Sequence, residues 1–503
     1  MQKDPPNNLS RRSFLSTVAV TTTVLAGGSI IPSTVASVSD AGKYGSANTT
    51  FQKDFWWGAA TAAYQIEGAV AEDGRKPSIW DTFSHLPGKT FNGDTGDVAC
   101  DHYHHFENDV RLMAELGVKH YRFSISWSRV MLEGRGAVNE RGMDFYRRLC
   151  DALHARNITP HATLYHWDLP QGLQDRYAGW QSREVVNDFG DYATAVVKRL
   201  GDRVAHWLTL NEIASFCYWN GYGVGKPGSH APGVQLKTRQ EQWQVIHNAL
   251  LAHGQACLAI RSATPQKCSV GVAECFTSCV PVIETPEHIA AARKAFVSDK
   301  LNGGILMPLL TGRYNETWLT KQKEDAPKFT EADMKLIGQP LDMLGFNCYT
   351  GSYIRSAQNE LGYEIIPKYE AYPRMNINWL EIVPEAVYWG VRMVGEAAGK
   401  RKLPIMVTEN GCPDGAKPDA SGNVLDTDRI MYLRAYLRNA QRAVSEGYPL
   451  IGYFPWSLMD NFEWAEGYNK RFGLMFTDYQ TQRRVPKLSY RWYQEVIRQH
   501  RIV

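Results

Sequence analysis

The chain has 503 residues, of which 44% are hydrophobic and 21% are charged, so it is long enough to bury a large core. Its formal net charge of +3, from 55 basic and 52 acidic residues, provides no electrostatic footprint for nucleic acid or an anionic membrane, and neither partner is expected. Nine scattered cysteines form no pair of CxxC elements. We therefore predict buried free thiols instead of a zinc ribbon or a disulfide scaffold.

The first residues have the layout of an export leader. Residues 10–15 read Ser-Arg-Arg-Ser-Phe-Leu, a twin-arginine pattern, and a weakly apolar run rich in Thr, Val and Ala continues to Ile31. We predict a signal peptide over residues 1–36, a short extension over residues 37–50, and a mature protein that is periplasmic or secreted. An uncleaved membrane anchor is the alternative. No other run approaches the roughly 18 apolar residues of a membrane span, so the mature form is not expected in a membrane.

From about Phe51 to the end, short β-branched or aromatic runs alternate with amphipathic helical stretches. The strand candidates are Trp56–Ala60, His120–Ile125, Thr159–Leu164, His206–Leu210, Ser269–Ala273, Met343–Asn347, Ile405–Thr408 and Ile451–Phe454. The helix candidates are Phe106–Leu116, Asp144–Ala155, Val185–Leu200, Trp243–Ser262 and Arg429–Ser445. This alternation predicts an α/β fold, a single (β/α)8 TIM barrel over residues 51–503. A two-domain doubly wound protein is the competitor, but it lacks the glycine-rich phosphate turn after the first strand.

Polar residues gather where the predicted strands end, which is the edge that carries chemistry in such barrels. They are Gln65 and Glu67 for the first strand, Arg122 and Trp127 for the second, Tyr165–Asp168 for the third, Asn211 and Glu212 for the fourth, Asn347 and Tyr349 for the sixth, Glu409–Gly411 for the seventh and Trp456 for the eighth. A purely structural barrel edge does not need Glu, Asn, His and Trp together, so we predict a catalytic site there.

Two of these residues, Glu212 and Glu409, are carboxylates at the ends of the fourth and seventh strands. A protonated carboxyl that assists the leaving oxygen and an ionised one that attacks or stabilises the anomeric carbon suit cleavage of a glycosidic bond. A separation of about 5–5.5 Å implies retention and about 6.5–9.5 Å implies inversion, and the pattern alone leaves both open. For either residue alone, a salt-bridged barrel-end carboxylate is the competing interpretation.

Six segments in order resemble glycoside hydrolase family 1, and the bacterial β-glucosidases within it, over Phe55 to Tyr493. They are Gly58–Gly68 (GAATAAYQIEG), Tyr121–Arg129 (YRFSISWSR), Thr163–Pro170 (TLYHWDLP), Thr209–Glu212 (TLNE), Thr408–Gly411 (TENG) and Trp456–Trp464 (WSLMDNFEW).

The resemblance implies a role for each matching residue. Glu212 matches the acid/base and Glu409 the nucleophile of a retaining enzyme. The residues expected to bind substrate are Gln65, His166, Asn211, Tyr349, Trp456, Glu463 and Trp464, with Arg122 and Asn347 in support. Arg122 and Tyr349 match contacts of the nucleophile, so an ionised form is predicted for Glu409, together with a bell-shaped pH profile in which Glu212 has a raised pKa and Glu409 the lower one. Asn211 matches the residue that holds the sugar 2-hydroxyl.

The chain departs from the family pattern in three places. Ile213 follows the acid/base where proline is usual, and Cys348 replaces the first of two tyrosines. Residues 214–234 and 364–379 match no fixed pattern, and we expect them to shape the aglycone side. No metal or cofactor is expected, because residues 101–105 (DHYHH) match a segment that leads into a helix.

The predicted activity is exo-acting hydrolysis of terminal β-D-glucosyl residues, in a β-linked glucoside or short oligosaccharide, through a covalent glycosyl-enzyme. A β-galactosidase or β-fucosidase stays open, because Glu463 can reach either arrangement of the fourth hydroxyl. A transglycosylase also stays open, since it uses the same intermediate. A catalytically inactive sugar-binding protein is the least favoured reading, because it has no need of two opposed carboxylates. The sequence makes no prediction of oligomeric state.

Overall fold

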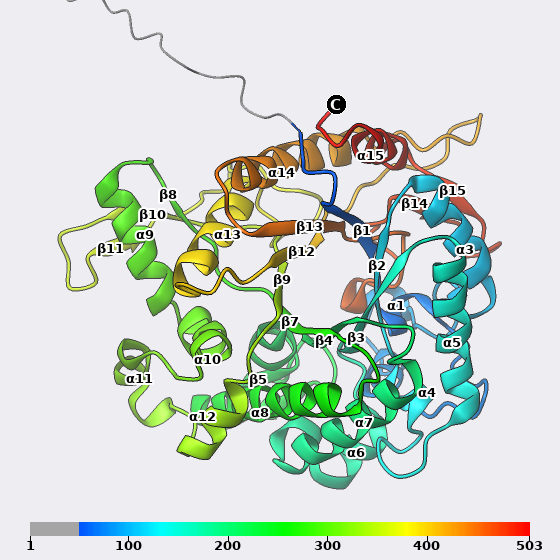
Figure 1. Cartoon of the computed structure of the whole chain (residues 1–503), viewed down its shortest axis with the longest axis horizontal. Coiled ribbons are helices and arrows are strands. Elements are labelled where there is room, and N and C mark those ends of the chain that lie inside the picture. The colour runs from blue at the N-terminus through cyan, green and yellow to red at the C-terminus, as the bar shows by residue number, and fades with distance from the viewer. Residues whose placement is uncertain (1–49) are drawn as a thin grey trace, which may run out of the picture. The chain divides into compact units, whose positions relative to one another are not determined.

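The computed structural model describes residues 50–503, and the predicted signal peptide and extension lie outside that range. Within it, eight parallel strands close into a barrel (Figure 1). These strands are β1 (Trp56–Ala60), β2 (His120–Ser124), β3 (Thr159–Tyr165), β4 (His206–Asn211), β7 (Ser269–Glu274), β9 (Met343–Asn347), β12 (Ile405–Asn410) and β13 (Leu450–Pro455). Their order around the ring is β1-β13-β12-β9-β7-β4-β3-β2. The predicted (β/α)8 fold and all eight predicted strands are confirmed.

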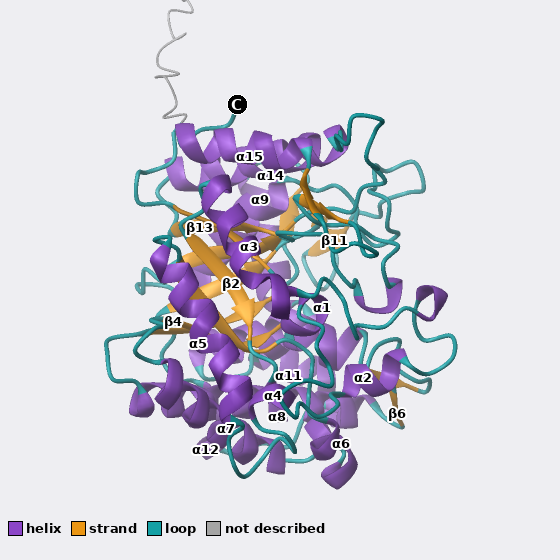
Figure 2. Ribbon diagram, turned by 90° about the vertical axis from the view of Figure 1, so that its right-hand side faces the viewer, coloured by secondary structure: helices purple, strands orange, loops and turns teal. Residues whose placement is uncertain are grey.

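Helices enclose the barrel, and in Figure 2 the strands lie within a layer of helices. The long helices are α3 (His102–Leu116), α5 (Glu140–Ala155), α7 (Glu184–Leu200), α8 (Arg239–Ala263), α9 (Pro286–Ser298), α13 (Glu385–Ala397), α14 (Thr427–Ser445) and α15 (Leu488–Gln499). The five predicted helices are present and each begins one to four residues earlier than predicted. The start of α8 shows why: Thr238 accepts from the N–H of Glu241 and forms a capping box with it, which fixes the first turn.

The loops between these elements contain shorter helices and strands. The short helices are α1 (Ala63–Ile66), α2 (Ile79–Ser84), α4 (Trp127–Val130), α6 (Gln171–Tyr177), α10 (Met307–Thr311), α11 (Glu316–Gln322) and α12 (Glu331–Ile337). Three small sheets pair β5 (Tyr222–Val224) with β6 (Val234–Leu236), β14 (Met475–Thr477) with β15 (Arg484–Pro486), and β10 (Ser352–Ser356) with both β8 (Cys279–Pro281) and β11 (Tyr363–Ile365). Asp101 is the N-cap of α3 and residues 102–105 form its first turn, so this segment begins a helix, as the resemblance implied.

Aromatic and imidazole rings fill the barrel at the amino ends of its strands. Trp56 stacks on His120 with ring centroids 4.8 Å apart, and His120 Nδ1 lies 2.9 Å from His161 Nε2. Burial lowers the pKa of His120 to about 3, so this layer is neutral at physiological pH. The amino end of the barrel is therefore a packed core, as is usual for this fold.

The nine thiols are all free, and seven of them are buried, which confirms the prediction. Across residues 50–503, no helix combines the length and apolar character that a membrane crossing requires. In the same part of the chain, no cluster of three or more His, Cys, Asp or Glu side chains is arranged to hold a metal ion.

Candidate active site

A cavity of about 550 Å³ opens at the carboxyl ends of the barrel strands. Eight of the residues predicted from the sequence line it: His166, Glu212, Asn347, Tyr349, Glu409, Trp456, Glu463 and Trp464. Gln65, Asn211 and Arg122 lie directly behind this wall and reach it through hydrogen bonds. The structure thus brings all eleven predicted site residues together.

Glu409 lies on β12 and is buried against a cation and a phenol. Arg122 Nη1 donates to its Oε1 at 2.6 Å, and the Tyr349 hydroxyl donates to its Oε2 at 2.9 Å. Burial nevertheless raises the pKa of Glu409 to about 7; the charge of Arg122 lowers it and Glu212 raises it again. The two predicted contacts are confirmed and both favour the ionised form, but the loss of solvation outweighs one guanidinium and one hydroxyl and leaves the pKa of Glu409 above its ordinary value.

The backbone geometry explains why the Thr-Glu-Asn-Gly segment ends in a glycine, Gly411. A Cβ atom at this position would lie 1.8 Å from the carbonyl oxygen of Trp456. Only glycine allows the chain after Glu409 to pass so close to the chain after β13. The close approach places the carboxylate and the indole of Trp456 on the same cavity wall.

Glu212 follows β4, with its carboxyl group held from both sides. Asn347 Nδ2 donates to its Oε1 at 2.7 Å, and the Ser215 hydroxyl donates to its Oε2 at 2.5 Å. The backbone of Glu212 has a φ of +52°, an uncommon conformation for a residue other than glycine. The side chain is 7% exposed, enough to face the cavity.

A short chain of hydrogen bonds links the two carboxyl groups. Arg122 donates to Glu409 and, through Nη2 at 2.6 Å, to Asn211 Oδ1. The same Oδ1 accepts from Asn347 Nδ2 at 2.9 Å, and Asn347 also donates to Glu212. The relative position of the two carboxyl groups is therefore fixed by three intervening side chains, which come from three different strands.

Indole and imidazole rings line one side of the cavity. His166 stacks with Trp456 and Trp464, at centroid distances of 5.7 and 6.0 Å. Burial lowers the pKa of His166 well below its usual range, so the ring is neutral. Its Nε2 accepts from Asn211 Nδ2 at 3.1 Å, which leaves the ring hydrogen on Nδ1. Nδ1 has no partner among the described residues and is a free donor.

Gln65 and Glu463 add amide and carboxyl groups on the same side. Gln65 Nε2 donates to the Phe462 carbonyl at 2.9 Å and lies 3.4 Å from Glu463 Oε2. Gln65 Oε1 accepts from no described residue. Burial raises the pKa of Glu463 to about 8. Apolar ring faces beside spare donors and acceptors suit the C–H faces and hydroxyls of a sugar.

The outer part of the cavity comes from the two segments that match no fixed pattern. Trp219, Asn220 and His230 belong to the first, and Ile377 and Trp379 to the second. Trp219 is 49% exposed and Trp379 is 50% exposed, so two indoles stand at the rim. The prediction that these segments shape the open side of the site agrees with their position.

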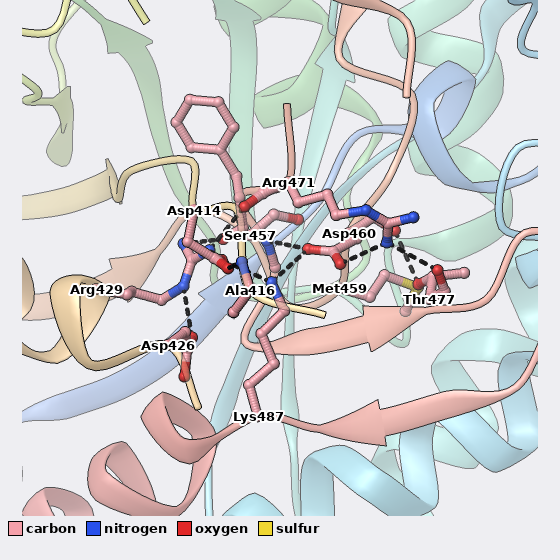
Figure 3. Close-up of polar contacts among 12 residues, drawn as sticks. Asp414, Ala416, Asp426, Arg429, Ser457, Met459, Asp460, Arg471, Thr477 and Lys487 are labelled. Atoms are coloured by element: carbon pink, nitrogen blue, oxygen red, sulfur yellow. Dashed lines mark hydrogen bonds and ion pairs between the residues drawn. The ribbon is translucent and has the colours of Figure 1, made fainter. Parts of the chain in front are cut away.

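A cluster of charged residues holds the loop Trp456–Trp464, which carries Glu463, against the rest of the barrel (Figure 3). We refer to Asp414, Asp426, Arg429, Asp460, Arg471 and Lys487 as the anchor cluster. Lys487 Nζ lies 2.8 Å from both Asp414 and Asp460, and Arg429 bonds Asp414 and Asp426. Asp414 continues the β12 segment and Asp460 lies within Trp456–Trp464. The cluster therefore ties the strand of Glu409 to the loop of Glu463.

Sequence reasoning missed two residues next to Glu212. Ser215 has no motif signal, because a serine three positions after a glutamate is common. Glu274 lies one position beyond the predicted end of the fifth strand, and that strand was the one without an assigned polar end. A longer strand with an acidic last residue was the signal that could have found it. Glu274 is 1% exposed and its carboxyl group accepts backbone N–H groups from the segment after Glu212.

A closed parallel barrel that holds two carboxyl groups, a neutral imidazole and indole faces around one cavity defines the class of barrel glycosidases. The chain belongs to glycosyl hydrolase family 1, because the model of that family matches residues 47–502.

Individual proteins to which this chain is similar are described as beta-glucosidases. Beta-glucosidase A of Acetivibrio thermocellus is 44% identical over 458 residues, which cover 89% of this chain and 98% of that protein. A bifunctional beta-D-glucosidase/beta-D-fucosidase of Bifidobacterium breve is 42% identical over 472 residues, which cover 90% of this chain and 98% of that protein. The solved structure of the beta-glucosidase from Thermotoga maritima in complex with deoxynojirimycin matches with a TM-score of 0.79 and 39% identity, over 90% of this chain and 100% of that one.

Proposed function

We propose that this chain is an exo-acting, retaining β-glucosidase that removes terminal non-reducing β-D-glucosyl residues. In this proposal Glu409 is the nucleophile and Glu212 the acid/base. One observation carries it: both carboxyl groups line one cavity and are held in register by the Arg122–Asn211–Asn347 chain of hydrogen bonds. The substrate is a β-linked glucoside or a short oligosaccharide, whose non-reducing sugar lies against Trp456, Trp464 and His166.

In the first step the Glu409 carboxylate attacks the anomeric carbon of the bound sugar. The bond from that carbon to the leaving oxygen breaks, and Glu212 transfers its proton to this oxygen. The aglycone departs as an alcohol, and the sugar is left as an ester on Glu409. Arg122 and Tyr349 favour the ionised form of Glu409 that this attack needs.

In the second step water enters from the side that the aglycone has left. The Glu212 carboxylate takes a proton from the water, whose oxygen attacks the anomeric carbon and releases Glu409. Two inversions restore the original configuration. Asn211 can hold the 2-hydroxyl during both steps, a contact that strengthens in the transition state.

The choice of sugar rests on the relatives, since the proteins from Acetivibrio thermocellus and Thermotoga maritima are described as beta-glucosidases. The Bifidobacterium breve relative is described as acting on both β-D-glucosides and β-D-fucosides, which makes β-fucosides the second candidate substrate. A panel of aryl β-glycosides with glucose, fucose, galactose and xylose headgroups tests this. We expect the highest kcat/KM for glucose, and a higher value for galactose would contradict the proposal. Product analysis with an added alcohol measures the share of transglycosylation.

We also propose that the protein is exported by the twin-arginine route, on the sequence of residues 10–31 alone. Replacing Arg11 and Arg12 by lysine should retain the protein in the cytoplasm. Sequencing the amino terminus of the exported form should place the cleavage site near Ala36. Export of the Lys-Lys variant at an unchanged level would argue against this route.

A further inference from the structure

Ile213 brings a backbone N–H to a place where the family usually has proline. Proline lacks this donor, so its replacement creates a polar group that needs a partner. Ile213 is fully buried, which rules out bulk water as that partner. Its N–H donates to Glu274 Oε2 at 2.8 Å.

Glu274 serves more than this one donor. Its Oε1 accepts the N–H of Cys275 at 2.9 Å and the N–H of Ala214 at 3.3 Å. Burial and the nearby Glu212 raise the pKa of Glu274 to about 8, and the three backbone N–H groups oppose that shift. A buried carboxyl group in this position has no part in the two-step reaction described above, so it needs another explanation.

The N–H groups of Glu212, Ile213 and Ala214 form a ladder against β7. The first donates to the Ala273 carbonyl at 2.8 Å, and the next two donate to the Glu274 carboxyl group. The ladder holds the turn in which Glu212 adopts its positive φ, a conformation that is unfavourable for an L-residue. Such a conformation persists only when the surroundings determine it.

We propose that Glu274 is a positioning residue for the acid/base, holding the Glu212–Ala214 turn through the N–H that Ile213 supplies. The inference rests on the proposed role of Glu212. It assigns Ile213 and Glu274 as a functional pair: with proline after the acid/base, the shortest of the three N–H contacts of Glu274 would be absent.

The test compares two β-glucosides that differ in their need for acid assistance. Cellobiose has a poor leaving group that requires a proton, whereas 2,4-dinitrophenyl β-glucoside has a leaving group that departs without one. Glu274→Leu removes the acceptor at similar volume. We expect kcat/KM for cellobiose to fall about 10- to 100-fold and kcat/KM for the dinitrophenyl substrate to fall less than about threefold, in line with the size of a general acid contribution.

A second substitution provides the decisive result. Adding Ile213→Pro to Glu274→Leu removes the N–H of residue 213, one of the three that lose their acceptor, and we expect it to recover part of the lost activity on cellobiose. Glu274→Gln keeps a carbonyl acceptor and should lose less than the leucine variant. Val272→Ala, on the same strand, is the matched control for general destabilisation and should affect both substrates equally.

An equal loss on both substrates in Glu274→Leu, or no recovery in the double variant, would overturn the inference. Failure of the proposed function gives a different pattern, because the unmodified protein would then hydrolyse neither substrate.

Discussion

Two groups of charges, the anchor cluster and the carboxyl groups of the cavity, contain buried acids whose pKa values move in different directions. In the anchor cluster, Arg429 and Lys487 hold the pKa of Asp414 below its ordinary value although it is buried. In the cavity, burial raises the pKa of Glu409 to about 7 and that of Glu463 to about 8. Asp426 shows that the contrast is one of degree, since burial raises its pKa despite Arg429.

The difference lies in the supply of cations. Three cations, Arg429, Arg471 and Lys487, face three acids in the anchor cluster. Among the described residues, Arg122, directly behind the cavity wall, is the cation that pairs with a predicted site carboxylate, and it contacts Glu409. Neutralised clusters stabilise a loop, whereas carboxyl groups that lack cations can hold a proton near neutral pH, which acid/base chemistry requires.

The largest effect should follow from removing the nucleophile. Glu409→Gly should lower turnover of an aryl β-glucoside by at least about four orders of magnitude, because no covalent intermediate can form. Added azide should restore cleavage and give a product of inverted configuration. Glu331→Gln, on the surface of α12, is a control that should keep full activity. Absence of azide rescue in a folded variant would remove Glu409 from this role.

Breaking the anchor cluster should mainly affect stability. Lys487→Met leaves Asp414 and Asp460 buried without their shared cation. We expect the free energy of unfolding to fall by about 3–5 kcal/mol. Urea unfolding measures the loss. The exposed pair of Arg498 and Glu495 offers a control, because Arg498→Met should leave the free energy of unfolding nearly unchanged. If Lys487→Met and Arg498→Met lowered the free energy of unfolding by similar amounts, the anchor cluster would have no special role in stability.

Replacing Glu463 should stabilise the protein at high pH, in contrast to the replacement of Lys487. Its pKa in the folded protein lies above that of an unfolded chain, so its contribution to stability is complete below about pH 4.5 and is lost as the pH rises toward 8. Glu463→Gln removes this loss. The variant should match the original protein in thermal unfolding at pH 4 and exceed it at pH 8, by on the order of 2 kcal/mol, while binding glucosides more weakly. A variant that is less stable at pH 8 would refute the pKa direction.

The smallest effect concerns the pH profile. Activity needs ionised Glu409, so kcat/KM should fall as the pH drops below about 7, forming the acidic side of a bell-shaped profile. Tyr349→Phe removes a hydrogen bond that lowers the pKa of Glu409. The acidic limb should therefore move to higher pH by about half a unit to one unit. A shift to lower pH would show that the phenol does not stabilise the carboxylate.

The sequence predicted the barrel well, because each strand is a short run rich in β-branched or aromatic residues that alternates with a longer amphipathic helical stretch. The site residues at the strand ends were also predictable, since a parallel barrel gathers the carboxyl ends of its strands at one edge, whereas Glu463 and Trp464 followed only from the family resemblance. The prediction was less successful where distant residues interact. Glu274 was missed because its partners, the N–H groups of Ile213 and Ala214, leave no mark in the sequence.

Local pattern thus determined the eight strands, five of the eight long helices and the identity of the two catalytic candidates, whereas α9, α13 and α15 were not predicted. Tertiary structure alone decided which charges are neutralised, because Asp414, Asp460 and Lys487 meet only when separate loops pack together. It also decided the pKa of Glu409, since the loss of water around a side chain depends on everything that surrounds it in the folded protein.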